Sequence, residues 1–344
     1  MPSLTSSTRD VARAVVALRR GGLVGLPTET VYGLAADAEN VAAVARVYAA
    51  KGRPADHPLI VHVEGPDRLD GWAVDVPGYA WRLARTLWPG PLTLVLPRGP
   101  RAGDHVTGGQ DTVGLRAPDH PVAQQVLAAF GGGLAAPSAN RFGRVSPTDA
   151  AHVLEELAGA LVDGLDVVLD GGPSRVGLES TILDCTGSQP AVLRPGAVGP
   201  ADIRHAAGVG VAVGARAGDV RAPGTLPAHY APAARVFLAT GDRQTREMLG
   251  PAPPAGARPT TGLLAPDGVG TPEGVVRLGA PADAADYARS LYRCLREADA
   301  LGLRRVVAVP PDADGPLAAA IGDRLRRAAR GATTWNGVVA AGGA

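Results

Sequence analysis

The chain has 344 residues, 46% of them apolar, and 34 Lys plus Arg balance 33 Asp plus Glu to a formal net charge of +1. This length accommodates two domains of ordinary size, and the apolar content is that of a globular protein. The near-zero net charge excludes a global attraction to nucleic acid or to a membrane surface, so a local cluster must hold any anionic ligand.

Targeting signals and metal motifs are absent from the sequence. It has no run of about 18 apolar residues to cross a bilayer, and its first residues lack the basic region and apolar core of a secretory signal. Cys185 and Cys294 lie far apart without a CxxC pair, which argues against a zinc site or a disulfide scaffold. We expect a cytoplasmic protein without membrane contact.

Strand and helix signals alternate over the first 208 residues. Several connections between predicted strands are too short for a crossover helix, so we expect an α/β domain with one large, twisted, mixed sheet and flanking helices. The predicted strands cover 23–26, 58–63, 92–97, 112–117, 134–136, 167–170, 180–185 and 191–194, and the predicted helices cover 9–20, 41–51, 79–88, 122–130 and 148–158.

Helix ends in this region have recognisable caps. Ser7 or Thr8 is placed to cap the first helix, and Asn40 to cap the second, in which Val41 belongs to the apolar stripe. The second helix ends at Lys51, before Gly52.

The remainder divides into a bridge and a second unit. Residues 209–233 are rich in Gly, Ala and Pro, and we interpret them as a linker or lid between domains 1–208 and 234–344. The second unit is expected to be a smaller, Rossmann-like α/β domain. Its predicted strands cover 235–239, 261–264, 275–278 and 305–309, and its helices 282–301 and 317–330.

Lys51 is the only lysine of the chain, although arginine is abundant. It stands two residues before Arg53, at a predicted junction between helix and strand. A compact ammonium group beside a guanidinium suits triphosphate oxygens or another small, dense anion. The alternative is a solvated surface lysine.

Polar residues also gather at other strand ends, where α/β folds place ligands. Alternation along strand 112–117 puts Thr112 and Arg116 on one face, and the guanidinium suits a carboxylate. Ser138 and Asn140 follow an apolar strand, while Ser146 or Thr148 is a candidate cap for the next helix. Two further polar segments are Pro27–Leu34, which can also be read as a self-capping turn, and Glu179–Thr181 with Arg194.

Several catalytic patterns are missing. The sequence has no phosphate loop of the GxxxxGK[ST] type, no complete dinucleotide fingerprint, no HExxH and no GxSxG. An enzyme of this kind works by positioning and charge neutralisation and not through a covalent intermediate.

Taken together, these segments resemble the threonylcarbamoyl-adenylate synthase family, in its long form with a YrdC-like catalytic domain and an extra C-terminal domain. The matching segments are PTETVYGL (27–34), KGRP and HPLIVH (51–62), TVGLRAP (112–118), APSANRFG and SPT (136–148), ESTILDC (179–185), LRPG (193–196) and HYAP (229–232).

The resemblance implies an activity. The family joins L-threonine, bicarbonate or CO2, and ATP into L-threonylcarbamoyl-AMP and releases pyrophosphate. The adenylate feeds a transferase complex that forms N6-threonylcarbamoyladenosine at position 37 of tRNA. Mg²⁺ is expected to arrive with ATP and not on protein side chains, and direct contact with tRNA is possible for such a protein.

The resemblance also implies roles for individual residues. Lys51 and Arg53 would be catalytic, and the HYAP bridge would act as a lid. His57 replaces an asparagine often found in the family. The threonine-binding residues would be Thr30, His62, Arg116, Ala136 through its backbone, and Ser180. The ATP-binding residues would be Arg53, His57, Thr112, Ser138, Asn140, Ser146, Arg194 and Tyr230.

Three other hypotheses fit parts of the pattern. A basic concave surface suits an RNA-binding module, against which the low net charge and the lack of interleaved aromatic residues count. A related carbamoyltransferase would carry zinc-binding cysteine pairs, which two distant cysteines do not supply. A purely structural α/β scaffold does not account for the Ser, Thr, Asn and Arg residues concentrated at strand ends.

Overall fold

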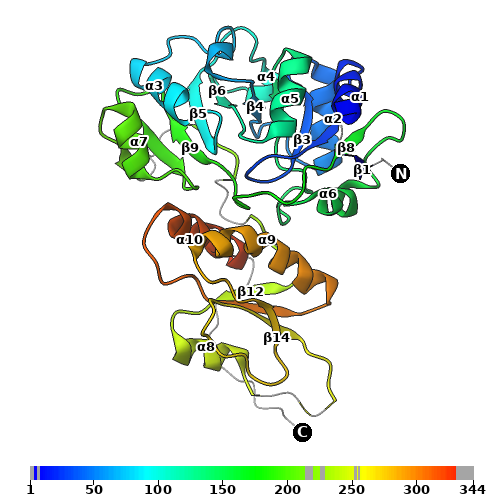
Figure 1. Cartoon of the computed structure of the whole chain (residues 1–344), viewed down its shortest axis with the longest axis vertical. Coiled ribbons are helices and arrows are strands. Elements are labelled where there is room, and N and C mark those ends of the chain that lie inside the picture. The colour runs from blue at the N-terminus through cyan, green and yellow to red at the C-terminus, as the bar shows by residue number, and fades with distance from the viewer. Residues whose placement is uncertain are drawn as a thin grey trace.

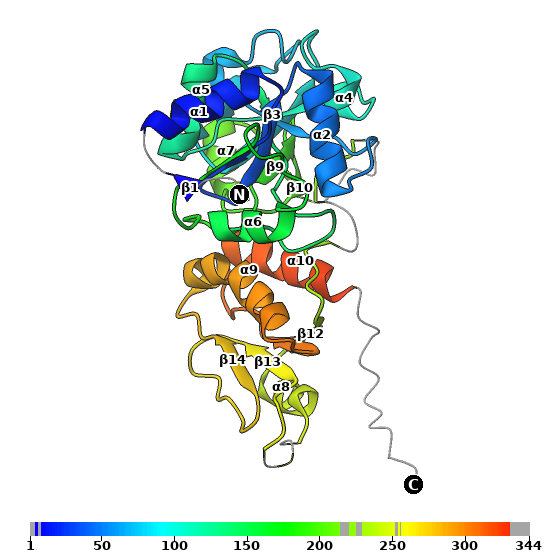
Figure 2. The same cartoon turned by 90° about the vertical axis from the view of Figure 1, so that its right-hand side faces the viewer.

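The computed structural model describes residues 4–5, 8–213, 220–224, 229–251, 254 and 256–330. They form two α/β domains, and the second turns its helices α9 (Ala284–Ala300) and α10 (Pro316–Ala329) toward the first (Figures 1 and 2). The predicted fold class is confirmed. Among the described residues no helix is both long and apolar enough to span a membrane.

The N-terminal domain is built on one mixed sheet of 11 strands, in the order β1-β8-β2-β3-β7-β4-β6-β5-β9-β10-β11. β6 pairs in parallel with β4 and antiparallel with β5. The strands are β1 Leu4–Thr5, β2 Val24–Leu26, β3 Gly33–Asp37, β4 Ile60–His62, β5 Leu92–Pro97, β6 Thr112–Arg116, β7 Leu134–Ala135, β8 Val167–Leu169, β9 Thr181–Asp184, β10 Ala191–Arg194 and β11 Ala212–Val213.

Helices cover this sheet in pairs. α1 packs beside α5, and α3 beside α7 (Figure 1). The apolar residues between the helices and the sheet form two buried clusters, one of which includes Trp72 and Leu94. The helices are α1 Thr8–Arg19, α2 Val41–Lys51, α3 Gly78–Leu87, α4 Asp104–Thr107, α5 Pro121–Phe130, α6 Ala150–Leu157 and α7 Pro200–Ala207.

The caps of α2 fix the position of Lys51. Asn40 caps the helix as predicted, because its side chain accepts a hydrogen bond of 3.1 Å from the Ala43 N–H. Gly52 ends it in the left-handed conformation at φ 60°. Lys51 is therefore the last residue of the helix, and only 3% of it is exposed.

Several local predictions were wrong. Asp149, and not Ser146 or Thr148, caps α6, accepting a hydrogen bond of 2.9 Å from the His152 N–H. Val41 was predicted to belong to the buried stripe of α2, but it is 60% exposed, and the buried residues of this helix begin at Ala43. Of the two predicted caps of α1, Thr8 is already within the helix, whereas Ser7 lies outside the described residues and stays a prediction.

Several elements were not predicted, namely β1, β3, α4, α7 and β11. β3 contains small residues with little strand preference, and it is a strand because β2 and β7 pair with its two edges. α7 has Pro200 in its first turn and Gly208 as its left-handed C-cap, so its signal was present in the sequence and was missed. The sheet also extends past residue 208, because β11 pairs with β10.

The C-terminal domain has a four-stranded parallel sheet in the order β12-β15-β13-β14. α8, which was not predicted, covers one face, while α9 and α10 cover the other. The elements are β12 Arg235–Leu238, α8 Asp242–Leu249, β13 Thr261–Leu264, β14 Val276–Gly279 and β15 Arg305–Ala308, together with α9 and α10.

An apolar interface joins the two domains. Val31, Val145 and Leu178 of the N-terminal domain are buried in the same cluster as Leu291 of α9 and Leu325 of α10. A shared core of this kind holds the C-terminal helices firmly against the loops of the first domain.

The core next to β7 has no room for a methyl group at Gly133. A Cβ atom there would lie 2.4 Å from Cζ2 of Trp72 and 2.7 Å from Cγ1 of Val61. We expect Gly133→Ala to lower the free energy of unfolding by about 1–3 kcal/mol through overpacking. Urea unfolding measures this. Gly159→Ala, whose Cβ would meet no atom within 4 Å, is the control, and equal stability of the two variants would contradict the packing described.

Candidate functional site

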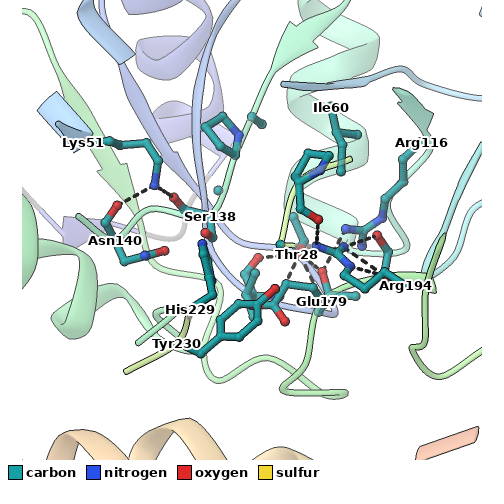
Figure 3. A pocket seen from close by; sticks show the side chains of 18 of the residues that line it. Thr28, Lys51, Ile60, Arg116, Ser138, Asn140, Glu179, Arg194, His229 and Tyr230 are labelled. Carbon is teal, nitrogen blue, oxygen red and sulfur yellow. Dashed lines mark hydrogen bonds between the residues drawn. The ribbon is translucent and has the colours of Figure 1, made fainter. Parts of the chain in front are cut away.

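A polar cavity lies where loops at the ends of sheet strands meet the bridge between the domains (Figure 3). It encloses about 50 Å³. Lys51 and Asn140 lie toward one end, Arg116 and Arg194 at the other, and Tyr230 between them (Figure 3). The lining consists of Thr28, Thr30, Val31, Gly33, Lys51, Arg53, Ile60, His62, Arg116, Ala136, Pro137, Ser138, Asn140, Phe142, Glu179, Ser180, Arg194, Pro223, Gly224, His229 and Tyr230.

Most of the predicted site residues meet in this cavity, although they are spread over 200 residues of sequence. Which ligand each one touches stays a prediction. Those in the lining are Thr30, Lys51, Arg53, His62, Arg116, Ala136, Ser138, Asn140, Ser180, Arg194 and Tyr230.

Three predicted site residues lie outside the lining. Thr112 stands at the start of β6, about 13 Å along the strand from Arg116, and lines a separate narrow gap. Ser146 is buried behind the cavity wall, and its hydroxyl donates a hydrogen bond of 2.6 Å to Glu179. The His57 ring packs edge-on against Phe142, with 5.3 Å between ring centroids.

Lys51 is held by main-chain oxygens. Its ammonium group donates hydrogen bonds of 2.5 Å to the carbonyls of Ser138 and Asn140. Burial lowers the pKa of Lys51 well below its ordinary value, and the nearby charge of Arg53 lowers it further. Burial thus destabilises the charged form of Lys51 in the free protein, and a negatively charged ligand offsets this cost.

Arg53 and Arg194 are held in the same way. Arg53 donates 2.9 Å to the Pro58 carbonyl, and Arg194 donates 2.9 Å to each of the carbonyls of Ser180 and Pro223. Burial lowers the pKa of both groups, that of Arg53 to about 10. Within the described residues, no carboxylate forms an ion pair with either arginine or with Lys51. These three cations therefore lack an ion-paired carboxylate, although the charge of Glu179 in the cavity wall lies near Arg194.

Arg116, in contrast, is already paired. Its Nη2 atom lies 2.6 Å from a carboxylate oxygen of Glu29, and both side chains are buried. Its Nη1 atom donates a hydrogen bond of 2.9 Å to the Thr30 hydroxyl. The other carboxylate oxygen of Glu29 accepts 3.0 Å from the Asp119 N–H. The guanidinium is fixed in orientation at the carboxyl end of β6, and its charge is balanced.

Glu179 and Ser180 form the wall beside Arg194. The Ser180 hydroxyl lies 2.8 Å from the Thr93 hydroxyl and 3.2 Å from Nη2 of Arg194. Glu179 accepts hydrogen bonds from Ser146, and from Tyr292 and Arg324 of the C-terminal domain. This contribution of the second domain was not predicted.

The bridge covers the cavity. Gln110 exchanges two hydrogen bonds with the main chain of Arg221, of 2.6 and 3.1 Å. Ala222 packs against Ile60 in a small apolar cluster. Gly224, at φ 76°, has no room for a side chain, because a Cβ atom would lie 2.1 Å from the Tyr230 hydroxyl. The segment 220–224 thus forms a tight cover.

Five buried polar atoms of the lining residues have no hydrogen-bond partner. Nη2 of Arg116 has its ion pair with Glu29, and the other four are Nδ1 of His62, Oδ1 of Asn140, Nδ1 of His229 and the hydroxyl of Tyr230. Burial lowers the pKa of each histidine to about 3, so both rings are neutral near pH 7. Burial raises the pKa of Tyr230, so its hydroxyl stays protonated. Such atoms are costly unless a ligand or water satisfies them.

A larger cavity of about 790 Å³ lies in the C-terminal domain, at the carboxyl ends of its four strands. Its lining contains Asp242, Asp283 and Asp312 and no lysine or arginine. Acidic side chains repel phosphates, so the smaller cavity with its arginines and lysine is the better candidate for an anionic substrate.

Sequence reasoning missed several lining residues. Thr28 belongs to the segment 27–34 and His229 to the segment 229–232, so the signal was present but no role followed from it. Glu179 was noted only as part of a polar segment at the start of a predicted strand region. Pro223 and Gly224 enter the site through the path of the bridge, for which the sequence offers no local signal.

Comparisons with known proteins define the class. Residues 16–196 match a family model described as "Telomere recombination" (Sua5, YciO and YrdC), and residues 198–330 match "Threonylcarbamoyl-AMP synthase, C-terminal domain". Threonylcarbamoyl-AMP synthase of Pyrococcus abyssi is 38% identical over 320 residues, covering 90% of this chain and 91% of its own length. That of Bacillus subtilis is 38% identical over 336 residues, covering 95% of each chain.

A solved structure agrees over nearly the whole length. The crystal structure of P. abyssi Sua5 complexed with L-threonine superposes with a TM-score of 0.83 at 34% identity, covering 95% of this chain and 96% of that one. The chain belongs to the threonylcarbamoyl-AMP synthase family, in its long, two-domain form. The family resemblance found in the sequence is confirmed.

The buried carboxylate of Glu179 leads to a pH-dependent prediction. Burial by itself would raise its pKa, but the charges of Arg324 and Arg194 and the Ser146 hydrogen bond lower it to about 2. The ionised group therefore stabilises the folded protein above the unfolded pKa of 4.5, and this contribution is lost as the pH falls from there to about 2.

We expect Glu179→Gln to lower the free energy of unfolding at pH 7, and the difference from the unsubstituted chain to shrink below about pH 4.5. Urea unfolding at a series of pH values measures both. A difference that does not change with pH would contradict the assignment.

Proposed function

We propose that this chain condenses L-threonine, bicarbonate or CO2, and ATP into L-threonylcarbamoyl-AMP and pyrophosphate in the cavity described above. Synthesis of threonylcarbamoyl-AMP is the activity that the family's relatives are named for. The observation that carries the assignment of the site is the set of three buried cations, Lys51, Arg53 and Arg194, that are held by carbonyls and lack a paired carboxylate. A polyanion such as the triphosphate of ATP supplies the missing negative charge.

The amino acid binds beside Arg116 in this proposal. Arg116 offers a fixed guanidinium to the threonine carboxylate, and Thr30 and His62 lie in the same wall. The threonine hydroxyl needs a partner to exclude valine, and Thr30 or Ser180 supplies one. The main chain at Ala136 completes this part of the cavity, and the L-threonine complex of the P. abyssi relative supports the assignment.

The reaction needs no nucleophile from the protein. The threonine amine adds to CO2 to give a carbamate, and a carbamate oxygen attacks the α-phosphorus of ATP. The bond from that phosphorus to the bridging oxygen breaks, and pyrophosphate leaves with the electron pair. Lys51, Arg53 and Arg194 neutralise the charge that grows on the leaving group, while Ser138 and Asn140 position the loop that holds Lys51.

Mg²⁺ is proposed to arrive on the phosphates. No cluster of His, Cys, Asp or Glu among the described residues has the geometry of a metal site. The carboxylate in the cavity lining, Glu179, is engaged by Arg324. When bound to ATP, the ion adds to the charge neutralisation of the triphosphate.

The bridge must move before ATP binds. A volume of about 50 Å³ holds a few waters, whereas pockets for organic ligands of nucleotide size measure about 300–1,000 Å³. Displacing the segment 220–224 frees Arg194 from the Pro223 carbonyl and opens the face of β6 toward Thr112. Reclosure brings this segment back over the substrates, beside Tyr230, and excludes water, as a lid does.

The proposed product is an unstable adenylate, which a tRNA threonylcarbamoyltransferase complex consumes in forming N6-threonylcarbamoyladenosine. We propose that complex as the downstream partner, in the cytoplasm. A gel shift with tRNA tests direct contact between tRNA and this chain.

Lys51 is the first residue to test. We expect Lys51→Met to lower kcat/KM for threonine-dependent adenylate formation by at least about 100-fold, because a preorganised cation at the triphosphate is lost. The assay supplies ATP and labelled bicarbonate, with and without threonine, and detects the labelled adenylate. Arg68→Met, on an exposed cation far from the cavity, is the control. Full activity of the Lys51 variant would refute the assignment.

The cover can be loosened at Gln110. Its side chain makes two hydrogen bonds to the bridge, each worth about 0.5–1.5 kcal/mol. Gln110→Ala should speed ATP association up to about tenfold, as measured by stopped-flow binding, because opening becomes easier. Gln124→Ala removes a hydrogen bond far from the bridge and should leave the rate unchanged. Identical rates in both variants would argue against opening at this segment.

A further inference from the structure

The Glu179 carboxylate in the cavity wall is held mainly by the C-terminal domain. Tyr292 of α9 donates hydrogen bonds of 3.1 and 2.9 Å to its two oxygens, and Nε of Arg324 of α10 donates 2.9 Å to one of them. All three side chains are buried, and Arg324 is 1% exposed. The second domain thus reaches the edge of the substrate cavity.

Arg324 also joins two strand ends. Glu179 stands just before β9 and Pro195 just after β10, and these strands are antiparallel neighbours. The guanidinium donates to the Glu179 carboxylate and, over 3.0 Å from Nη2, to the Pro195 carbonyl. Because a guanidinium is a rigid planar fork, it sets the spacing of the two chain ends.

The residues on these chain ends are the ones that the proposed reaction uses. Ser180 follows Glu179, and Arg194 precedes Pro195. Arg194 itself donates hydrogen bonds of 3.1 and 2.9 Å to the Ser180 carbonyl. A shift of either strand end therefore moves two residues together: Ser180, which is proposed to contact threonine, and Arg194, which is proposed to contact the triphosphate.

The same two C-terminal side chains support the lid residue Tyr230. Its ring stacks on Tyr292, with 5.8 Å between centroids and 28° between planes, and the Arg324 guanidinium lies 5.3 Å from its centroid. Tyr230 has a positive φ of 62°, a conformation that needs support from its surroundings.

We propose that Arg324 and Tyr292 are positioning residues of the catalytic site, so that the C-terminal domain completes this site instead of being an independent appendage. They act through Glu179, Pro195 and Tyr230 on the placement of Ser180 and Arg194. This inference rests on the proposed function, because it assigns those two residues to substrate binding.

The test compares kinetic constants, not activity alone. We expect Arg324→Met to raise KM for both threonine and ATP by about 10- to 100-fold, because displacement of Ser180 and Arg194 weakens the binding of both substrates. Tyr292→Phe keeps the ring stack and loses only the hydroxyl, so a smaller rise is expected. Arg324→Lys keeps the charge without the fork and should rescue only part of the loss.

A matched control separates positioning from domain cohesion. Arg296 of α9 pairs with Glu156 of α6 across the same domain interface, at 3.3 Å, and neither residue lines the cavity. Arg296→Gln should lower the unfolding midpoint and leave both KM values unchanged. If Arg296→Gln and Arg324→Met change stability and KM alike, the second domain is only a scaffold and the proposal fails.

Removing Arg324 alone leaves a buried, unpaired carboxylate that can prevent folding. The double variant Glu179→Gln with Arg324→Met removes both charges and should fold, yet its KM values should stay raised. Unchanged KM values in a folded Arg324 variant would overturn the proposal.

The unsubstituted chain is tested first in the labelled-bicarbonate assay. This step distinguishes failure of the proposed function from failure of the positioning role. If the unsubstituted chain forms no threonine-dependent adenylate, the proposed function fails. Calorimetric titration of the same variants with L-threonine and with ATP then decides the positioning role by itself: weaker binding in the Arg324 variant supports it, and equal binding refutes it.

Discussion

Buried positive charge without an ion-paired carboxylate is the constraint around which the site is built. Lys51, Arg53 and Arg194 lose most of their hydration on folding and have mainly main-chain carbonyls as partners. Carbonyl dipoles hold an ammonium or a guanidinium in place without cancelling its charge. The loops that supply them, around residues 58, 138–140, 180 and 223, are therefore organised by the cations, and the free protein bears a cost that an anionic substrate relieves.

The cationic side chains of the cavity differ in how they are paired. Among the described residues, no carboxylate forms an ion pair with Lys51, Arg53 or Arg194, whereas Arg116 is balanced by Glu29 and held against Thr30. In the proposed function, a zwitterionic amino acid brings no net charge and suits the balanced Arg116, whereas a triphosphate brings several negative charges and suits the three cations without an ion pair. The difference follows from the pairing of a single arginine.

The domain interface and the site share one buried cluster. The pKa of Glu179 is strongly lowered by the charges of Arg324 and Arg194 and by the Ser146 hydrogen bond, and Tyr292 also donates a hydrogen bond to this carboxylate. Buried ion pairs and hydrogen bonds contribute little to net stability compared with apolar packing, but they fix the orientation of the side chains that form them. The apolar core shared by α9, α10 and the loops of the first domain supplies the cohesion, and the polar cluster at its edge supplies the geometry.

The sequence by itself determined the fold class, most strand positions, the Asn40 cap that places Lys51, and the family. These rest on local signals: apolar periodicity, capping residues, and short motifs that keep their meaning in isolation. Only the tertiary structure decided that Thr112, Ser146 and His57 lie off the cavity lining, that Glu29 balances Arg116, and that Arg324 and Tyr292 reach Glu179 from more than 100 residues away. Such pairings depend on how the sheet, the bridge and the second domain pack, and no local pattern encodes the partner of a buried charge.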